Sequence, residues 1–497
     1  MNYAADLMAP GPSREGRPLF VEVDSGRSIT WDELRTRVQA FAGHLIARGV
    51  TPGSKVVLHL FNSIDAVVAH YAVHVLGAAA CWVDALVQPK SMGHYVGVTG
   101  CRLLLTHVPK DALGAEVLAK ADVLPAADIE RLSATPPPAP CPPAPHDFAP
   151  DEPAYVYFTS GTTSLPKGVV LTPANHASFT RICDRSWRPV DETSRHLCYV
   201  PFSHGFGTVF LVPLTLRTRS TTFLMRAFHP LKVLETVARE RITHLYGVPS
   251  HYQQLLRMKP GREALASLRM AFCAAAKLEH GLMLDWERAS GVVLCEGYGL
   301  IETCCGVTWR VGEPSRGTGD MGPCPDPALV EIGILDEEDR PVPPGTTGQI
   351  AVRGPSVMQG YLGDPEATAR AMAPGGWFKS GDQGHVTADG RLFLTGRIKD
   401  IINIAGIKVS PFEVEAVLDA HPAVLQSAVT AVTDPLYGEV VKAFVRVRPG
   451  HALTERELLR FASQQLINFQ VPKVVQFVES FPLNNMGKLD RKRLATL

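Results

Sequence analysis

The sequence has no uninterrupted apolar run long enough to cross a bilayer. In its most apolar stretch, residues 67–87, two histidines and Asp84 interrupt the run and Gly77 divides it, which favours a buried helix followed by a buried strand. Residues 1–20 contain no basic segment followed by an apolar run, the pattern of a secretory signal. We therefore expect a cytoplasmic protein without a membrane span.

An excess of either charge is also missing, because 49 lysines and arginines balance 49 aspartates and glutamates. This balance argues against a nucleic-acid partner held by bulk electrostatic attraction, although it leaves a local patch open. Ten cysteines are present, including the adjacent Cys304 and Cys305, but none have the CxxC spacing, so neither a zinc site nor a disulfide framework is supported. The pattern is typical of reduced thiols in a cytosolic protein.

The chain has 497 residues, which is too many for one hydrophobic core and predicts two or more domains. Its sequence pattern also changes from one part of the chain to the next. Residues 28–134 alternate amphipathic helical patterns with short apolar runs, as βαβ units of a parallel sheet do. After a proline-rich connector at 135–145, the alternation continues to about residue 310. From residue 319 short strands separated by glycine and proline indicate a small barrel or a strongly twisted sheet. A further domain begins near residue 400.

A polar loop between two strand-like runs is the first candidate site, in the stretch YVYFTSGTTSLPKGVVL at residues 155–171. Glycine allows backbone N–H groups to approach oxyanions closely, hydroxyls add donors and Lys167 adds a charge, so the loop could cradle a polyphosphate. It is not the standard P-loop, because Pro166 rather than glycine precedes the lysine. By itself the loop is equally well interpreted as a polar turn between strands. Its hydroxyl and glycine residues are Thr159, Ser160, Gly161, Thr162, Thr163, Ser164 and Gly168.

The segments that follow this loop decide between the two interpretations. In order and content they resemble the motifs of the adenylate-forming superfamily, which comprises acyl-CoA synthetases, adenylation domains of peptide synthetases and luciferases. The loop itself resembles the phosphate loop of that superfamily, and the resemblance covers nearly the whole chain. The other matching segments are EGYGLIET (296–303), GQIAVRGPSVMQGY (348–361), GWFKSGDQG (376–384), GRIKDIINIAGIKVSPFEVE (396–415) and FPLNNMGKLDRKRL (481–494).

The resemblance implies an α/β fold with a large N-terminal domain, built from two βα sheets and a small distorted β-barrel, and a smaller mobile α+β C-terminal domain. It places the N-terminal domain at residues 1–396, a hinge at 397–400 that includes Asp400, and the C-terminal domain at 401–497. Rotation about such a hinge can limit turnover as much as the chemistry does.

The activity that the resemblance implies has two steps. A carboxylate attacks the α-phosphate of MgATP to give an acyl-adenylate and pyrophosphate, and a thiol then displaces AMP. The first step needs no general base, because a carboxylic acid is already ionised at neutral pH. Catalysis therefore depends on positioning and on neutralising phosphate charge. ATP, Mg²⁺ and coenzyme A are the expected cofactors.

The resemblance also assigns the nucleotide site by position. Asp382 would bind both ribose hydroxyls with its two oxygens, and Arg397 would contact the ribose or a phosphate. Glu296 is expected to accept from the adenine amino group, unless it is simply a solvated carboxylate. The polar loop and Lys167 would hold the β- and γ-phosphates. The remaining nucleotide-binding residues are Ala274, Ala275, Ala276, Gly297, Tyr298 and Gly299, with Tyr298 and the alanines on opposite faces of adenine.

Two residues are assigned the charge neutralisation that the reaction needs. Lys488 is expected to be the main catalytic cation, between the acyl carboxylate and the α-phosphate. Glu302 is expected to be a catalytic residue as the magnesium ligand, because a carboxylate oxygen suits a hard cation.

Three positions depart from the superfamily pattern. Ser164 replaces a glycine, Lys277 replaces a proline, and Ile301 replaces a threonine or serine whose hydroxyl would reach the α-phosphate. Losing one hydrogen bond to a charged group costs about 1.5–3 kcal/mol. Thr303, two residues further on, is a candidate replacement for this hydroxyl.

His204, in the segment PFSHGFG at 201–207, matches the histidine of the acyl pocket and is counted with the catalytic residues. Relatives that activate amino acids carry an aspartate nearby to pair the substrate ammonium. Phe202 and Ser203 offer no acid, and an unpaired ammonium is costly to bury, so we expect a simple aryl or aliphatic acid. The rest of the pocket is expected from Phe206, Tyr246, Gly247, Leu300 and Gly306.

For the second step, GIKVSPFEVE at 406–415 resembles CoA ligases more than peptide-synthetase domains, with Gly406 beside the tunnel for the thiol. Three alternatives stay open: loading of the acid onto a separate acyl-carrier protein, a non-catalytic sensor of ATP or acyl-AMP, and, with less support, a luciferase-type oxygenase. The leading hypothesis is an ATP-dependent acyl-CoA synthetase that acts on a small carboxylic acid.

Overall fold

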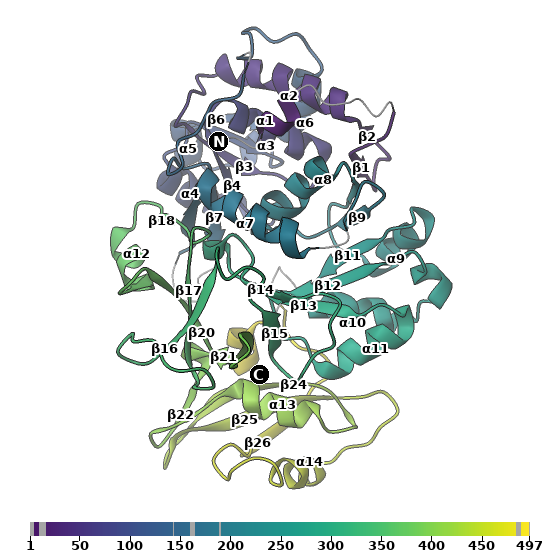
Figure 1. The fold of residues 1–497 in the computed structure, drawn as a ribbon, viewed down its shortest axis with the longest axis vertical. Helices are drawn as coiled ribbons and strands as arrows, with labels where there is room; N and C mark the ends of the chain where they lie inside the picture. The colour runs from purple at the N-terminus through teal and green to yellow at the C-terminus, as the bar shows by residue number, and fades with distance from the viewer. Residues whose placement is uncertain are drawn as a thin grey trace.

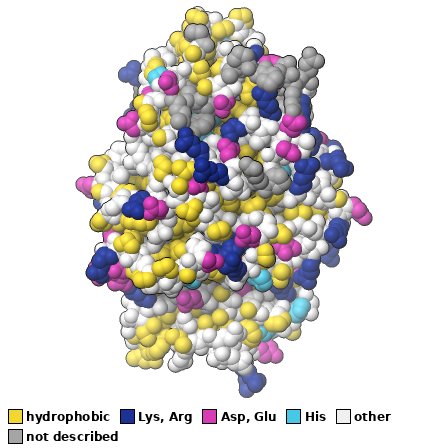
Figure 2. Space-filling view, viewed as in Figure 1, with side chains coloured by type: hydrophobic (Ala, Val, Ile, Leu, Met, Phe, Trp, Pro, Cys, Tyr) yellow, Lys and Arg dark blue, Asp and Glu magenta, His cyan; other side chains and the backbone are white. Residues whose placement is uncertain are grey.

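The computed structural model describes residues 4–8, 16–142, 144–159, 165–187, 190–483 and 489–496. In Figure 1 the C-terminal elements, in light green and yellow, gather at one end of an elongated molecule. On the face shown in Figure 2, basic and acidic side chains are interspersed rather than gathered by sign. Within the described residues, no helix combines the length and the apolar character that a membrane crossing requires.

A seven-stranded sheet has the order β18-β8-β7-β4-β3-β5-β6. The strands from β7 to β6 are parallel, whereas β8 and β18 are each antiparallel to their neighbours. Alternate residues of β3 pack into separate cores on its two faces, Val56 and Leu58 into one and Val57 into the other, as buried parallel strands do. The strands are β3 (Lys55–His59), β4 (Ala79–Trp82), β5 (Leu103–Thr106), β6 (Asp122–Pro125), β7 (Tyr155–Thr159), β8 (Lys167–Leu171) and β18 (Gly360–Tyr361).

An eight-stranded sheet has the order β14-β13-β12-β11-β9-β10-β1-β2. Its six inner strands are parallel, and β2 and β14 are antiparallel at the edges. The strands are β1 (Phe20–Glu22), β2 (Ser28–Ile29), β9 (Arg195–Cys198), β10 (Thr221–Leu224), β11 (His244–Gly247), β12 (Met270–Ala274), β13 (Leu294–Tyr298) and β14 (Thr308–Arg310). The two predicted βα sheets are therefore confirmed.

Helices cover these sheets. Ser63 caps α3, every residue of which is buried except Asp65, and the chain then enters β4; this confirms the buried helix and strand predicted for residues 67–87. Thr30 and Glu33 form a capping box at the start of α2. The helices are α1 (Ala4–Met8), α2 (Trp31–Ile46), α3 (Ile64–Val75), α4 (Met92–Thr99), α5 (Ala115–Lys120), α6 (Ala126–Ser133), α7 (Pro173–Ser186), α8 (Val212–Thr218), α9 (Pro230–Arg239), α10 (Pro249–Arg257), α11 (His280–Ser290) and α12 (Pro365–Ala371).

The third sheet is antiparallel and has the order β15-β21-β20-β17-β16, with β19 paired to β20. Its strand pairs have register shifts at three places, and irregularities of this kind increase the local twist of a sheet. The predicted barrel is not closed among the described residues, because the edge strands β15 and β16 do not pair, and β15 instead lies beside β14. The strands are β15 (Asp320–Pro323), β16 (Glu331–Leu335), β17 (Gly348–Arg353), β19 (Met372–Ala373), β20 (Trp377–Val386) and β21 (Arg391–Arg397).

The C-terminal elements have their own core, in which Val414 and Leu418 pack against Val429 and Val441. The sheet has the order β23-β22-β25-β24, and β26 adds to β25. The elements are β22 (Ile402–Ile404), β23 (Ile407–Val409), α13 (Pro411–Asp419), β24 (Val424–Asp434), β25 (Gly438–Val447), α14 (Glu455–Ala462), β26 (Val474–Phe477) and α15 (Arg491–Ala495). A short 3₁₀ helix, η7 (Ile398–Asp400), lies at the proposed hinge, and the exact domain boundaries remain a prediction.

Candidate active site

The predicted ribose residues Asp382 and Arg397 lie together with Tyr298, predicted to pack on adenine, where β13 meets the third sheet. The Tyr298 hydroxyl donates to Asp382 Oδ2 at 2.8 Å, and Arg397 Nε lies 3.0 Å from Oδ1 of the same carboxylate. Asp382 stands opposite Arg397 in the β20–β21 register, so backbone pairing fixes this contact. Burial raises the pKa of Asp382, and Arg397 opposes that shift. The carboxylate is thus held between one neutral donor and one cation, which suits recognition of paired hydroxyls.

The proposed adenine walls have a close-packed backbone. Ala274 ends β12 opposite Gly297 of β13, and Ala275 has a left-handed φ of 70°. A Cβ on Gly297 would lie 2.6 Å from the Phe272 ring, and one on Gly299 would lie 2.2 Å from the Cys305 carbonyl oxygen. Only glycine fits at these two positions. Of the other two proposed wall residues, Ala275 is exposed and Ala276 is half-buried.

Glu296 is buried, so the alternative of a solvated carboxylate is wrong. It stands opposite Arg310 in the β13–β14 register, with Arg310 Nη2 3.8 Å from Oε2. Burial raises the pKa of Glu296 to about 8 and outweighs the opposing charge of Arg310. Glu296 also lines a cavity of about 10 Å³, roughly the space of one water molecule. A protonated carboxyl here could donate as well as accept at the adenine edge.

A second group of residues lies where the phosphates are expected. Lys167 begins β8 opposite Thr159, and its Nζ lies 5.0 Å from the centroid of the Tyr361 ring. The Tyr361 hydroxyl donates to Glu302 Oε1 at 3.1 Å. Burial raises the pKa of Glu302. Tyr361, the last residue of GQIAVRGPSVMQGY, therefore joins the predicted lysine to the predicted metal ligand, a link that motif matching alone did not specify.

The buried Glu302 carboxylate fits a divalent cation, because Mg²⁺ prefers one or two carboxylates and completes its shell with water and phosphate oxygens. Within the described ranges, no group of three or more His, Cys, Asp or Glu side chains is arranged to hold a metal. The predicted loop residues Ser160, Gly161, Thr162 and Thr163, the departure Ser164 and the predicted catalytic Lys488 lie outside the described residues.

The predicted acyl pocket has aromatic walls. Phe206 lies 5.3 Å from Tyr246 and 6.4 Å from Phe272, measured between ring centroids, and it is stacked on Phe272. The Tyr246 hydroxyl is hydrogen-bonded to His196 Nδ1 at 2.8 Å, so the polar group of this side chain already has a partner. A Cβ on Gly306 would lie 2.7 Å from the ring of Phe179, so this position too requires glycine.

The remaining pocket residues pack tightly. A Cβ on Gly247 would lie 3.0 Å from the Tyr199 hydroxyl, and Leu300 is half-buried beside the core. Ile301, the departure from the superfamily pattern, packs toward Gly205. The proposal that Thr303 supplies the missing hydroxyl is wrong, because Thr303 is fully buried and its Oγ1 is bonded to the backbone of Leu300.

An acid does lie beside His204, although it comes from a distant segment. His204 Nε2 is 3.3 Å from Asp84 Oδ2. Asp84 follows β4 by two residues, and the carboxyl ends of parallel strands are common places for ligand-binding residues, which was the available sequence signal. Phe202 and Ser203, the residues next to the histidine in the chain, gave no sign of this acid.

The predicted hinge and thiol residues have different surroundings. Asp400 Oδ2 is 3.6 Å from Arg491 Nε. Gly406 is exposed on the β22–β23 hairpin with a left-handed φ of 91°, and no described heavy atom lies within 4 Å of an added Cβ. A role of Gly406 beside the thiol tunnel therefore requires another arrangement of the two domains, and it remains a prediction.

Lys277 joins the two domains. Its Nζ lies 3.1 Å from Asp419 Oδ2 and 3.5 Å from Glu415 Oε2 of α13, and 4.7 Å from the centroid of the Phe412 ring. We call these four residues the interdomain cluster. Burial alone would lower the pKa of Lys277, but Asp419 and Glu415 hold it above its usual value.

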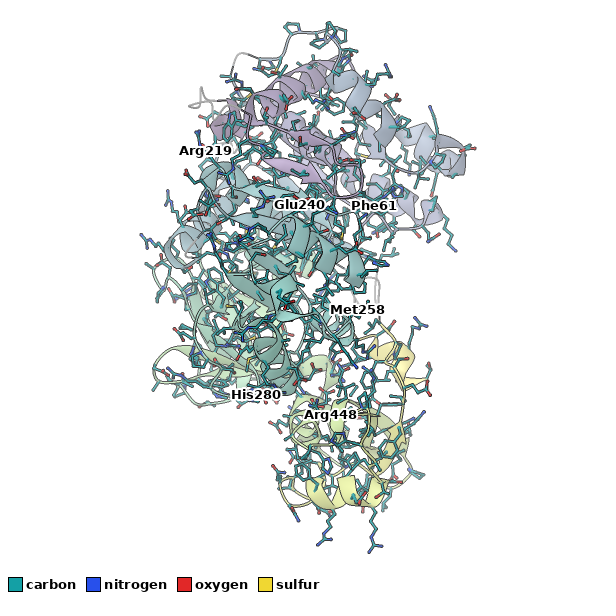
Figure 3. The ribbon with its side chains drawn as sticks, turned by 90° about the vertical axis from the view of Figure 1, so that its right-hand side faces the viewer. Phe61, Arg219, Glu240, Met258, His280 and Arg448 are labelled. Atoms are coloured by element: carbon teal, nitrogen blue, oxygen red, sulfur yellow. The ribbon has the colours of Figure 1, made fainter. Side chains whose placement is uncertain are left out.

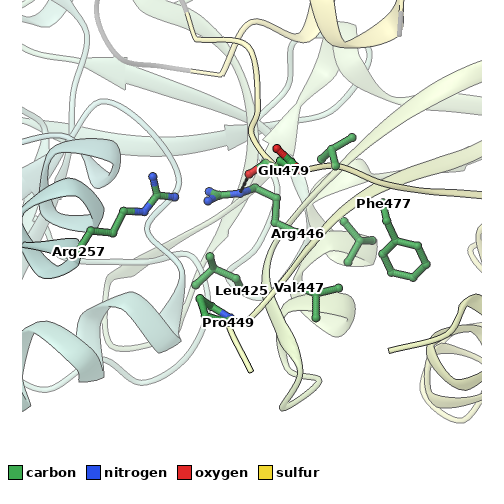
Figure 4. A pocket seen from close by; sticks show the side chains of 9 residues that line it. Arg257, Leu425, Arg446, Val447, Pro449, Phe477 and Glu479 are labelled. Carbon is green, nitrogen blue, oxygen red and sulfur yellow. Dashed lines mark hydrogen bonds between the residues drawn. The ribbon is translucent and has the colours of Figure 1, made fainter. Parts of the chain in front are cut away.

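A groove of about 570 Å³ lies at the same domain boundary. Figure 4 shows the guanidinium groups of Arg257 and Arg446 facing each other across it, one from each domain. In Figure 3, Met258 and His280 lie on the N-terminal side of the boundary and Arg448 on the C-terminal side. Because its walls come from both domains, any domain rotation would reshape the groove.

Comparison with known proteins agrees with this geometry. The family model described as AMP-binding enzyme matches residues 12–362, and the AMP-binding enzyme C-terminal domain matches residues 413–488. A feruloyl-CoA synthase of Amycolatopsis sp is 33% identical over 470 residues, which cover 93% of each chain. A fatty acid–[acyl-carrier-protein] ligase of Streptomyces coeruleorubidus is 31% identical over 501 residues, covering 94% of this chain and 91% of the relative.

The crystal structure of ATP-bound MatB from Rhodopseudomonas palustris superposes with a TM-score of 0.89 at 28% identity, over 100% of this chain and 99% of that one. These matches confirm the predicted ATP-dependent, AMP-forming acyl-CoA synthetase, with ATP and coenzyme A as its cosubstrates. The two family models together span most of the sequence, so this chain belongs to the AMP-binding enzyme family.

Proposed function

We propose that this chain activates an aromatic carboxylic acid with MgATP and transfers the acyl group from the adenylate to coenzyme A. The observation that carries the proposal is the convergence of two residue groups at one place: Tyr298 with Asp382 and Arg397, and Lys167 with Tyr361 and Glu302. The first group suits a ribose and the second suits a polyphosphate with its cation.

In the first step, Asp382 holds the ribose and Lys167 neutralises the phosphates that leave as pyrophosphate. Bound Mg²⁺ at Glu302 supplies further charge neutralisation on these phosphates. Lys488 is proposed to reach the acyl carboxylate and the α-phosphate. The carboxylate oxygen forms the new bond to the α-phosphorus while the bond to pyrophosphate breaks. No residue has to remove a proton, which agrees with a site that contains cations and hydrogen-bond donors rather than a general base.

An aromatic acid is favoured by the walls of the acyl pocket. The Phe206 ring is stacked on Phe272 and tilted against Tyr246, and a pocket lined by such rings favours flat aromatic ligands. The relative named as a feruloyl-CoA synthase supports the same choice. Aliphatic acids remain the second candidate class.

Coenzyme A is the proposed thiol, and an acyl-carrier protein is the alternative, supported by the carrier-protein ligase among the relatives. Since ATP and coenzyme A are both cytosolic metabolites, a cytoplasmic location is part of the proposal. A sensor that binds ATP without releasing pyrophosphate is the alternative from a different class.

The test is pyrophosphate release with MgATP across a panel of cinnamates, benzoates, short and medium fatty acids and amino acids, with and without coenzyme A. Mass spectrometry of the products separates acyl-AMP from acyl-CoA. We expect an aromatic acid to give the highest kcat/KM and acyl-CoA as the product. Release stimulated by a phosphopantetheinylated carrier protein but not by coenzyme A would overturn the choice of thiol, and ATP binding without release for any acid would overturn the enzyme.

A further inference from the structure

The contact between Asp84 and His204 joins the two large sheets at the acyl pocket. Asp84 follows β4 of the seven-stranded sheet, whereas His204 ends the 3₁₀ helix Phe202–His204, which follows β9 of the eight-stranded sheet. His204 Nε2 and Asp84 Oδ2 are 3.3 Å apart, and each side chain is 24% exposed. The pair is therefore sheltered but remains in contact with solvent.

Both oxygens of Asp84 are engaged. Oδ1 accepts from the backbone N–H of Leu86 at 2.8 Å, which closes a turn within the loop after β4. Oδ2 faces His204. An acid is therefore present near the acyl pocket, and the amino acids in the substrate panel test whether it also receives a substrate ammonium.

The partner of Asp84 Oδ2 is the imidazole. A carboxylate beside a histidine favours the protonated ring and, in the neutral ring, fixes the proton on the nitrogen that faces it. The backbone of His204 is also held, because the Cys305 thiol donates weakly to its carbonyl oxygen at 3.9 Å. These two contacts give the ring one preferred orientation.

We propose that Asp84 is a positioning residue for acid binding, which holds the His204 ring in one orientation at the acyl pocket where the substrate carboxylate arrives. This inference rests on the proposed function, because it names a further residue of the same site. Because His204 is assigned to the acyl pocket, the effect of Asp84 is expected on the binding of the acid rather than of ATP.

The test compares wild type with Asp84→Asn, which keeps the shape and removes the charge. The KM for the acid is expected to rise about fivefold, the upper end for a partly exposed pair, while the KM for ATP and the melting temperature stay unchanged. Asp84→Glu should restore part of the loss. In a His204→Gln background, Asp84→Asn should have no further effect on the KM for the acid, since the two residues act as one unit.

The chain offers a matched control in a second pair of the same kind. His146 Nε2 lies 3.2 Å from Glu152 Oε2, the side chains are 27% and 25% exposed, and Glu152 also accepts from a backbone N–H, that of Ala149. Glu152→Gln should leave the KM for the acid unchanged. An equal rise in the KM for the acid in Glu152→Gln and Asp84→Asn would overturn the proposal. Additive effects of Asp84→Asn and His204→Gln on this KM would overturn it as well.

A readout without turnover separates this inference from the proposed function. The ring nitrogen signals of His204, identified by their loss in His204→Gln, can be followed in long-range proton–nitrogen NMR spectra. We expect Asp84→Asn to shift them and Glu152→Gln to leave them in place. Unchanged His204 signals in Asp84→Asn would refute the positioning role even if the wild-type enzyme were fully active, whereas shifted signals in a protein inactive toward every acid would contradict only the proposed function.

Discussion

The interdomain cluster predicts how the two domains are held in the arrangement described here. Lys277 Nζ is within 3.5 Å of two carboxylates on α13, and its side chain is only 15% exposed. Replacing Lys277 by methionine keeps most of its apolar volume and removes the charge that bridges the domains. The substitution therefore tests the ion pairs rather than the packing.

The expected free-energy cost depends on the partners that Glu415 and Asp419 keep once Lys277 is replaced. Removing one partner of a buried ion pair costs about 3–5 kcal/mol, because the other charge stays buried. The lower end applies here, since Arg491 still pairs with Glu415 at 2.7 Å and Ser427 still donates to Asp419 at 2.7 Å. About 3 kcal/mol corresponds to roughly a hundredfold change in the equilibrium between this arrangement and any other in which the cluster is separated.

The assay is fluorescence energy transfer between one dye on each domain, combined with single-turnover kinetics of the two half-reactions. We expect Lys277→Met to reduce the population of the present arrangement and to slow adenylate formation. Thioester formation from supplied acyl-adenylate should keep its rate or increase, because the thiol step is expected to follow a rotation of the C-terminal domain out of the adenylation arrangement. The control is Lys379→Met, which breaks a 2.7 Å pair with Asp339 inside one domain. An unchanged energy-transfer distribution, or equal slowing of both half-reactions, would refute the reasoning.

Three further predictions follow from single residues. Burial raises the pKa of Glu296 to about 8, so the folded protein holds a proton that the unfolded chain has already released. The free energy of unfolding should therefore fall as the pH rises between about 5 and 8, by at most about 5 kcal/mol. Denaturant titrations of Glu296→Gln should show a smaller fall. Lys488→Ala should abolish adenylate formation and spare thioester formation from supplied acyl-AMP; equal loss of both would contradict its assigned role. Gly406→Leu should slow only the thiol step, with about 1–2 kcal/mol of backbone strain from its left-handed φ, and a collapse of adenylate formation would make the tunnel assignment wrong.

Local patterns predicted much of the fold. The alternation of helical and apolar segments predicted parallel βα units, and the family resemblance implied two such sheets; both faces of the strands are buried, as Val56 to Leu58 show. Closure of the third sheet was not predictable in the same way. Whether β15 pairs with β16 or lies beside β14 depends on contacts between segments that are distant in the sequence.

In the site, too, local motifs were informative, whereas contacts between distant segments were not predicted. Motif positions identified Asp382, Tyr298 and Glu302, which the structure brings close to the partners that their chemistry requires. The contacts of Asp84 with His204 and of Lys277 with α13 were missed, since each joins residues more than a hundred positions apart. The burial of Glu296 was not predictable from the sequence either, because it depends on Arg310 and on the surrounding sheet rather than on its neighbours in the chain.

The measurement that tests the central claim most directly follows the oxygen of the acid. A carboxylic acid labelled with ¹⁸O in both carboxyl oxygens is incubated with the enzyme, MgATP and coenzyme A, and the AMP produced is analysed by mass spectrometry. Attack of the carboxylate on the α-phosphate, followed by thiol attack on the acyl carbon, predicts one ¹⁸O atom in each AMP formed. Unlabelled AMP, or ADP as the product, would contradict the adenylate route and with it the roles assigned to Lys167, Glu302 and Lys488.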